Sequence, residues 1–322
     1  MEIIVELSKI SKNYKHKKLK SYFTSRDVNS SVYPVLSDIS LTVSAGTCVG
    51  LLGANGCGKS SLIKIISGIQ RPDTGEIQVL NETPYHRKIK FLKNIGVVFG
   101  HKSSMWWDLP PVSSFKAFKS IYKIPDEIYE KNLEELKAAL MLNDILHTPT
   151  RNLSLGERVK CEIAISLMHS PKLLLLDEPT IGLDASSKQQ IRKYINRKVA
   201  SGMSVMLTSH DASDIKECCS RALTLDKGRI CQDVAINNAN YVPMVTLIIT
   251  SLSPFQITRE GLQSILLHTT NSKINQLDAY QWEISAPKSN FAKVLMAIDQ
   301  LKHLDWEIKN TDNIISLPPL SL

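Results

Sequence analysis

The amino-acid sequence predicts an α/β protein whose main sheet has parallel strands, followed by a smaller α+β unit. Three observations lead to this prediction. Apolar segments of strand length alternate with segments of helical periodicity over residues 47–234, which is typical of a parallel sheet covered by helices. A glycine-rich segment separates one of these strands from the next helix. After residue 240 strands and helices follow in a different order, so we expect two domains.

The predicted elements follow one another closely along the chain. The first strands are expected at residues 3–10 and 39–43, with a polar loop at residues 15–34 between them. Further strand-length segments lie at residues 47–52, 77–80, 95–99, 172–177, 203–208, 222–226 and 229–234. Helical periodicity covers residues 59–69, 113–146, 157–169 and 211–218.

The composition is that of a folded globular protein. The 322 residues are 43% hydrophobic, which suffices for a large core and a smaller one and excludes a disordered or fibrous chain. The apolar runs fall short of the roughly 20 residues that span a bilayer, so a role at a membrane requires a partner chain. Six cysteines lack metal-ligand spacing and are expected to be reduced thiols. The basic run around residues 15–20 fits a solvated loop or, alternatively, contact with anionic lipid or nucleic acid.

The glycine-rich segment at residues 53–60, Gly-Ala-Asn-Gly-Cys-Gly-Lys-Ser, matches the phosphate-binding pattern G-x-x-x-x-G-K-[ST]. Its glycines let the backbone turn so that successive N–H groups face a phosphate, and the following helix directs its positive end at the same anion. Lys59 is expected to neutralise the β- and γ-phosphates. Ser60 would place its hydroxyl on Mg²⁺, and Ser61 would donate to a phosphate. The strand, loop and helix together predict an ATP site.

An apolar strand that ends in two acidic residues supplies a second part of the predicted site. Four leucines at residues 173–176 precede Asp177 and Glu178. Asp177 suits Mg²⁺ binding, either directly or through the metal's outer coordination shell. Glu178 suits polarisation of the attacking water, a contribution of about 10²–10⁴-fold in rate. By itself this pattern is weak evidence, because an exposed acidic turn is its default interpretation, so its weight depends on the other motifs.

A third motif, Leu-Ser-Leu-Gly-Glu at residues 153–157, opens a helix, and with it the sequence resembles the ABC ATPases. The motifs stand in that family's order: the phosphate loop at 53–60, the Q-loop segment around His101, the signature at 153–157, the acidic strand at 173–178, the D-loop at 181–184 and the H-loop at His210. The resemblance covers residues 1–235. It implies an ABC-type P-loop NTPase domain with a helical subdomain.

The resemblance also implies a mechanism in which a homodimer encloses two ATP molecules. Ser154 and Gly156 of one copy would face the phosphate held by Lys59 of the other, and His210 would act on the γ-phosphate beside Glu178. The implied ATP-binding residues are Tyr14, Gly53, Asn55, Gly56, Cys57, Gly58, Lys59, Ser60, Ser61, Ser154, Gly156, Glu157 and Asp184. Tyr14 stands where the family stacks an aromatic ring on adenine, although a core tyrosine fits nearly as well.

Two positions depart from the family pattern. Leu155 replaces a glycine of the signature, but Ser154 and Gly156, which lie nearest the phosphate, remain. His101 stands where the family has a glutamine that reaches Mg²⁺ and the attacking water. A neutral histidine can replace some of those hydrogen bonds, whereas a protonated one repels the metal. We therefore expect hydrolysis that is slower or more sensitive to mild acid, with His101, Ser60 and Asp177 as the implied metal-site residues.

The segment after His101 resembles one subgroup of the family. Trp106 and Trp107 precede Asp-Leu-Pro, as in bacterial type-2 exporter and predicted multidrug exporter ATPases. This resemblance implies a separate transmembrane permease that docks near the two tryptophans, and hence a location at the cytoplasmic face of the cell membrane. The alternative is that both rings belong to the core. Two alternative functions are an importer ATPase and a non-transport ABC ATPase that acts on ribosomes or DNA. For the exporter function we expect no nucleic-acid partner.

The C-terminal pattern predicts a separate small domain. A linker is expected at residues 236–243, which contain Asn-Asn-Ala-Asn and a proline. Strands at residues 244–250, 273–277 and 281–285, and at 306–309 or 313–317, alternate with helices at 259–267 and 290–301. This order is close to βαββαβ, the ferredoxin-like arrangement, over residues 244–322. Such a module can bind an effector or dimerise, and its fold alone establishes neither role.

Overall fold

The computed structural model describes residues 2–16, 31–100, 103–209, 211–236, 244–251, 273–276, 281–287 and 304–309. The chain divides into two compact units. The larger comprises Met1–His210 and Asp214–Ile236, and the smaller comprises Asp211–Ser213 and Asn237–Leu322. The expected domain limits, with a linker at residues 236–243, remain predictions.

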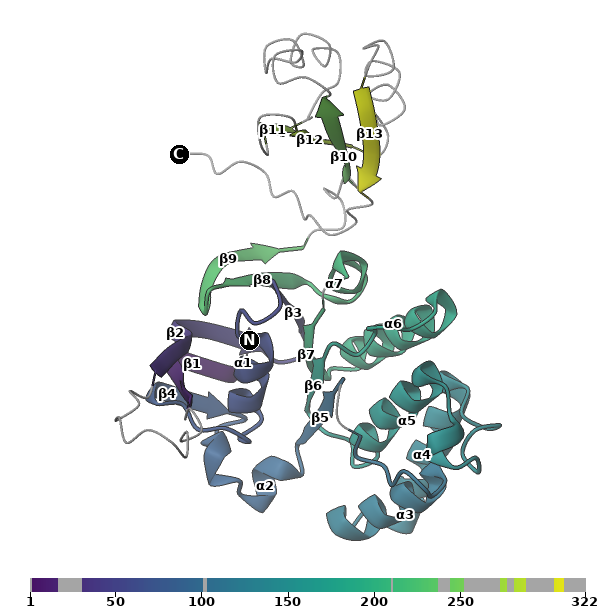
Figure 1. The fold of residues 1–322 in the computed structure, drawn as a ribbon. Coiled ribbons are helices and arrows are strands. Elements are labelled where there is room, and N and C mark those ends of the chain that lie inside the picture. The colour runs from purple at the N-terminus through teal and green to yellow at the C-terminus, as the bar shows by residue number, and fades with distance from the viewer. Residues whose placement is uncertain are drawn as a thin grey trace, which may run out of the picture. The chain divides into compact units, whose positions relative to one another are not determined.

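The larger unit is built on a six-stranded sheet in the order β5-β6-β7-β3-β8-β9 (Figure 1). These strands are Ile95–Phe99 (β5), Leu173–Asp177 (β6), Ser204–Thr208 (β7), Cys48–Leu52 (β3), Arg221–Asp226 (β8) and Arg229–Ala235 (β9). The first five pair in parallel, which confirms the predicted parallel sheet. β9 pairs antiparallel with β8 across a turn in which Lys227 and Gly228 both have positive φ. Such two-residue turns match the twist of a hairpin.

A second, antiparallel sheet in the order β2-β1-β4 was not foreseen in the sequence analysis. Its strands are Ile3–His16 (β1), Ser31–Ser44 (β2) and Thr74–Val79 (β4). The polar loop expected at residues 15–34 was therefore drawn too wide, because both flanking strands extend into it. The end of β1 reads Ser-Lys-Asn-Tyr-Lys-His and has no apolar run, and Pro34 near the start of β2 argues against the interior of a strand.

Helices flank the six-stranded sheet. Helix α1 (Lys59–Ile66) lies on the side of the antiparallel sheet, and α3 to α6 lie on the other side (Figure 1). The remaining helices are α2 (Ile89–Leu92), α3 (Pro111–Tyr122), α4 (Asp126–Leu140), α5 (Leu155–Leu167), α6 (Ala185–Ala200) and α7 (Ala212–Cys218), with single 3₁₀ turns at Pro84–His86 and Thr150–Asn152.

Two helix predictions need correction. The single helix expected at residues 113–146 is two helices, because Lys123 ends α3 with a positive φ and Pro125 caps the start of α4. Helix α6 was missed altogether. Its buried face includes only Ile191, Tyr194 and Ile195 as large apolar residues, so its sequence pattern is weak.

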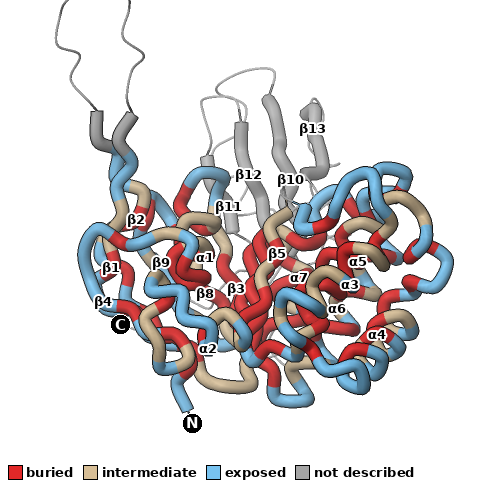
Figure 2. The backbone as a smooth tube through the Cα atoms, turned by 90° about the horizontal axis from the view of Figure 1, so that it is seen from below, coloured by how far each residue is buried: buried red, intermediate tan, exposed pale blue. Residues whose placement is uncertain are grey.

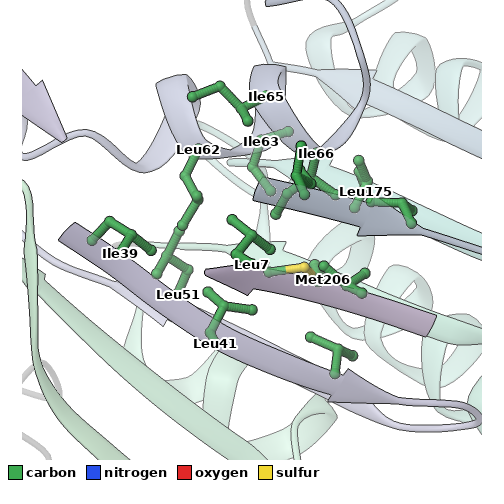
Figure 3. Close-up of a cluster of buried hydrophobic side chains, with 14 of the residues drawn as sticks. Leu7, Ile39, Leu41, Leu51, Leu62, Ile63, Ile65, Ile66, Leu175 and Met206 are labelled. Atoms are coloured by element: carbon green, nitrogen blue, oxygen red, sulfur yellow. The ribbon is translucent and has the colours of Figure 1, made fainter. Parts of the chain in front are cut away.

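The core lies between the two sheets and surrounds α1. Leu62, Ile63, Ile65 and Ile66 of this helix are all fully buried. Figure 3 shows these side chains among those of neighbouring strands, including Leu51. Burial is concentrated on the central strands and α1, while the outer loops are exposed (Figure 2). Burying each such side chain stabilises the fold by about 1.5–3 kcal/mol. This packing holds α1, and with it the end of the phosphate loop, in place.

The smaller unit contains a four-stranded antiparallel sheet in the order β11-β12-β10-β13. Its strands are Met244–Ser251 (β10), Lys273–Gln276 (β11), Gln281–Pro287 (β12) and Leu304–Lys309 (β13). They confirm the expected strands and place the last one at the first of its two candidate positions. The helices expected at residues 259–267 and 290–301 lie outside the described residues, so the ferredoxin-like arrangement remains a prediction.

Candidate active site

The phosphate loop between β3 and α1 has a backbone that only glycine permits at two positions. Gly53 has a φ of 148°, and a Cβ atom there would lie 2.3 Å from the carbonyl oxygen of Leu225. Gly58 has a φ of 113°, and its Cβ would lie 2.8 Å from the carbonyl oxygen of Val35. Any side chain would therefore push the loop off the strands beneath it. The glycines of the sequence motif hold the loop tightly against the sheet.

Lys59, the first residue of α1, places a buried ammonium group inside this loop. Its Nζ donates hydrogen bonds to the carbonyl oxygens of Gly53 at 2.7 Å and Ala54 at 3.2 Å. The same atom lies 3.8 Å from Oε1 of Glu178. The ammonium group thus lies between the loop and the acidic residues at the end of β6, where it can neutralise a bound phosphate.

The ends of β6 and β7 form the acidic side of the site. Asp177 and Thr208 pair across these two strands. The Thr208 hydroxyl donates to Oδ1 of Asp177 at 2.7 Å and accepts from the backbone N–H of Glu178 at 2.9 Å. Glu178 has a φ of 54°, a conformation that costs a non-glycine residue about 1–3 kcal/mol unless its surroundings hold it. Thr208 therefore fixes both acidic residues, a role that sequence reasoning missed.

The other predicted residues of the loop lie around α1. Asn55 and Gly56 are exposed at the loop tip, Cys57 is buried, and Ser60 is half-buried. Tyr14 is also partly exposed on β1. Its hydroxyl donates to Oε1 of Gln70 at 2.8 Å and lies 3.4 Å from Oγ of Ser61. The expected adenine-stacking residue is thus beside the helix that begins at the phosphate loop.

The signature segment forms the N-terminus of α5. Ser154 caps the helix: its hydroxyl accepts from the N–H of Glu157 at 3.3 Å, and the Glu157 carboxylate accepts from both the N–H and the hydroxyl of Ser154, each at 2.8 Å. This reciprocal arrangement is a capping box. The Glu157 carboxylate is therefore engaged in holding Ser154, and the adjacent Leu155 is partly exposed.

Gly156 brings the N-termini of α5 and α6 together. A Cβ on Gly156 would lie 2.8 Å from Oγ of Ser187. Asp184 caps α6 and accepts from the N–H of Ser187 at 2.9 Å and from its hydroxyl at 2.7 Å. These hydrogen bonds lower the pKa of the Asp184 carboxyl. The signature and the D-loop therefore form one cluster, which holds an ionised carboxylate at neutral pH.

The predicted residues fall into two groups. One gathers Lys59, Asp177 and Glu178 around the phosphate loop, and the other gathers the signature and Asp184. The helices that carry them, α1 and α5, lie on opposite sides of the six-stranded sheet (Figure 1). His101 and His210 lie outside the described residues, so their roles remain predictions.

The segment after residue 102 is exposed around Trp106 and is held to α5 at Ser103 and Ser104. Trp106 and Trp107 are each 52% exposed, which favours the docking patch over two core rings. The Arg158 guanidinium lies 5.4 Å from the centre of the Trp107 ring. The buried Glu162 carboxylate of α5 accepts hydrogen bonds from the hydroxyl of Ser103 and from the N–H of Ser104, the latter at 2.9 Å. Glu162, also missed from the sequence, ties this segment to the signature helix.

Within the described ranges, every helix is too short or too polar to cross a membrane.

The fold and the phosphate loop define a P-loop nucleotide-binding protein. The ABC transporter family model matches residues 36–181, which include the phosphate loop, the signature and the acidic strand. Over residues 36–181 the chain is an ABC transporter ATP-binding protein, and its relatives fit the type-2 exporter subgroup. ABC ATPase domains bind ATP.

Three similar proteins illustrate the match. The uncharacterized ABC transporter ATP-binding protein YhcH of Bacillus subtilis is 25% identical over 241 residues, 74% of this chain and 72% of that protein. The Nod factor export ATP-binding protein I of Ralstonia nicotianae is 30% identical over 61% of this chain and 60% of its own length. A dimeric post-hydrolysis structure of the ATP-binding cassette MJ0796 with ADP and Pi has a TM-score of 0.63 at 21% identity, covering 73% of this chain and 99% of that one. The last similarity concerns the fold alone.

Proposed function

We propose that this chain hydrolyses ATP and thereby powers a membrane ABC transporter. The observation that carries the proposal is the convergence of Lys59, Asp177 and Glu178 at the phosphate loop. Lys59 supplies positive charge beside the loop. Its Nζ lies 3.8 Å from Oε1 of Glu178. A carboxylate held there can take the proton of a water molecule that attacks the γ-phosphate.

We assign the proposed roles as follows. The phosphate loop and Ser61 bind the phosphates, and Tyr14 stacks on the adenine. Ser60 and Asp177 hold Mg²⁺, and their hydroxyl and carboxylate oxygens fit the ligand preference of that ion. When bound there, Mg²⁺ would supply positive charge that stabilises the charge developing on the phosphate oxygens. Glu178 is the general base, and His210 and His101 orient the attacking water.

The signature cluster completes a composite site in a homodimer. Ser154 is held at the start of α5 by Glu157, and Gly156 leaves room for Ser187 and Asp184 at the start of α6 beside it. Backbone N–H groups and the helix dipole at this end favour an anion. Because the phosphate loop and the signature lie on opposite sides of the sheet, one copy would present its signature to the ATP of the other. Asp184 contacts the same composite site.

The proposed partner is a separate exporter permease at the cytoplasmic face of the membrane. The half-exposed Trp106 and Trp107 give this partner an aromatic docking patch, since such rings are enriched at protein interfaces. The name of the Nod factor export relative supports the direction of transport. The C-terminal unit, a proposed ferredoxin-like domain over residues 244–322, would serve regulation or dimerisation.

Purified chains test the hydrolysis directly. Wild type should release phosphate from Mg-ATP. Glu178→Gln should lower kcat by about 10²–10⁴-fold while ATP still binds, and Lys59→Ala should weaken ATP binding. Phosphate release and binding of a fluorescent ATP analogue measure these two effects separately. Wild-type protein that binds ATP without hydrolysing it, or equal rates for wild type and Glu178→Gln, would refute the proposal.

The transport role needs a second experiment. Tagged Glu178→Gln protein, held with ATP and purified from detergent-solubilised membranes, should bring down an integral membrane protein. The double variant Trp106→Ala/Trp107→Ala, matched for expression, should recover less of it. Recovery only with ribosomes or DNA would overturn the transport proposal and leave the ATPase proposal intact.

A further inference from the structure

A buried carboxylate outside the family motifs connects several parts of the site. Asp214, on α7, is completely buried. Its Oδ2 accepts a hydrogen bond from the hydroxyl of Ser209 at 2.6 Å and another from the hydroxyl of Thr180. Its Oδ1 accepts from Nε of Arg192 at 2.6 Å. Both oxygens of one carboxylate are therefore engaged by three different segments.

Two of these segments carry the proposed catalytic residues. Thr180 is two residues beyond Glu178, in the turn after β6. Ser209 immediately precedes His210 and immediately follows Thr208, whose hydroxyl contacts both acidic residues. Thr180 and Ser209 are themselves buried. Asp214 thus connects the turn after β6 to the segment after β7.

The third segment is α6, which begins at the D-loop. Arg192 of this helix forms an ion pair with Asp214 at 2.6 Å and a second one with Glu217 at 3.0 Å. A buried carboxylate without such partners would carry a large desolvation penalty. The hydroxyls and the guanidinium together compensate that penalty, and they do so only while all three segments keep their positions.

We propose that Asp214 is a positioning residue for the hydrolysis step, an inference that rests on the proposed ATPase function. Glu178 and the segment that carries His210 must act on one water molecule, so their separation has to be constant. Asp214 holds that separation through its hydrogen bonds from Thr180 and Ser209. Among the described residues, Asp214 has no contact with the phosphate loop. Its replacement should therefore leave ATP binding unchanged.

Steady-state kinetics of Asp214→Asn test this proposal. Asparagine keeps the shape of the side chain but removes the charge and one acceptor. We expect kcat to fall by about 10- to 100-fold, as for a misplaced catalytic group, with the KM for ATP and the affinity for a fluorescent ATP analogue within about threefold of wild type. Parallel falls in kcat and ATP affinity, or an unchanged kcat, would overturn the positioning role. Wild-type protein without ATPase activity would instead refute the proposed function.

Two further sets of variants separate positioning from general stability. Arg221→Ala removes an exposed ion pair to Asp233 between β8 and β9 and should leave kcat within about twofold of wild type. If Asp214→Asn does not fold, Thr180→Val and Ser209→Ala each remove a single hydrogen bond to Asp214. Each should lower kcat at constant KM. Wild-type kcat in both would contradict the proposal.

Discussion

The phosphate-loop cluster and the signature cluster are constructed by different means. The first is buried at the ends of three parallel strands, and its loop is fixed by backbone contacts that exclude any side chain at Gly53 and Gly58. The second lies at two helix N-termini, where the side chains of Glu157 and Asp184 act as caps. The first cluster is therefore complete within one chain. The second presents helix ends outward, as a surface for a second copy requires.

The largest effect is expected from alanine substitutions at one glycine of each cluster. Gly58→Ala would place a methyl group 2.8 Å from a backbone oxygen at a φ of 113°, so we expect ATP affinity to fall at least about 100-fold, measured by nucleotide titration. Gly156→Ala would place a methyl group 2.8 Å from the Ser187 hydroxyl, which donates to Asp184, and would thereby disturb the signature cluster and not the phosphate loop. That variant should bind ATP normally as a monomer and lose ATP-driven dimerisation. Equal ATP affinities for the two variants would show that the clusters do not differ in this way.

A smaller loss is expected for Thr208→Val. Valine has the same shape but leaves the buried Asp177 carboxylate and the N–H of Glu178 without the hydroxyl, at a cost of about 1–3 kcal/mol in unfolding free energy. Hydrolysis should fall as well, because Glu178 loses a contact that holds its strained backbone. Urea unfolding and phosphate release measure the two effects. Thr208→Ser, which keeps the hydroxyl, should restore both, and a failure to do so would contradict this role.

Glu157→Gln should change only the signature cluster. Glutamine can retain the cap on Ser154 through its carbonyl oxygen while removing a negative charge from the place where a phosphate would approach. We expect ATP-driven dimerisation to strengthen by a few fold, or about 0.5–1 kcal/mol, in sedimentation experiments. Weaker dimerisation of this variant would mean that the carboxylate supports closure of the dimer.

The smallest effect concerns acid stability at the D-loop. Hydrogen bonds from Ser187 lower the pKa of Asp184 in the folded state. The stability that they contribute is therefore fully present above the unfolded carboxyl pKa of about 3.9. It is lost as the pH falls through the lower, folded-state pKa. Wild type should therefore be slightly more stable than Ser187→Ala at pH 7, and the two should converge below about pH 4. A constant difference over this range, in urea unfolding, would contradict this assignment.

Sequence reasoning recovered what is contiguous in the chain and missed what depends on distant contacts. The phosphate loop, the acidic strand and the signature each consist of neighbouring residues whose chemistry is evident from their types. Thr208, Glu162 and Asp214 become informative only once buried hydrogen bonds are known, because isolated threonine and acidic residues are common in any sequence. Helix α6 was missed since most of its residues are polar. The antiparallel sheet was not foreseen, because the pairing of β1 with β2 and β4 depends on contacts between segments that are distant in the sequence.

The most direct test of the account is the ATP-dependent oligomeric state of the Glu178→Gln chain. Without nucleotide this variant should be monomeric, and with Mg-ATP it should form a dimer, measured by light scattering after size-exclusion chromatography. Introducing Ser154→Arg into the same chain places a bulky side chain at the signature and should abolish the dimer while ATP still binds. A chain that binds ATP and stays monomeric, or a dimer that forms despite Ser154→Arg, would contradict a composite site made of two copies.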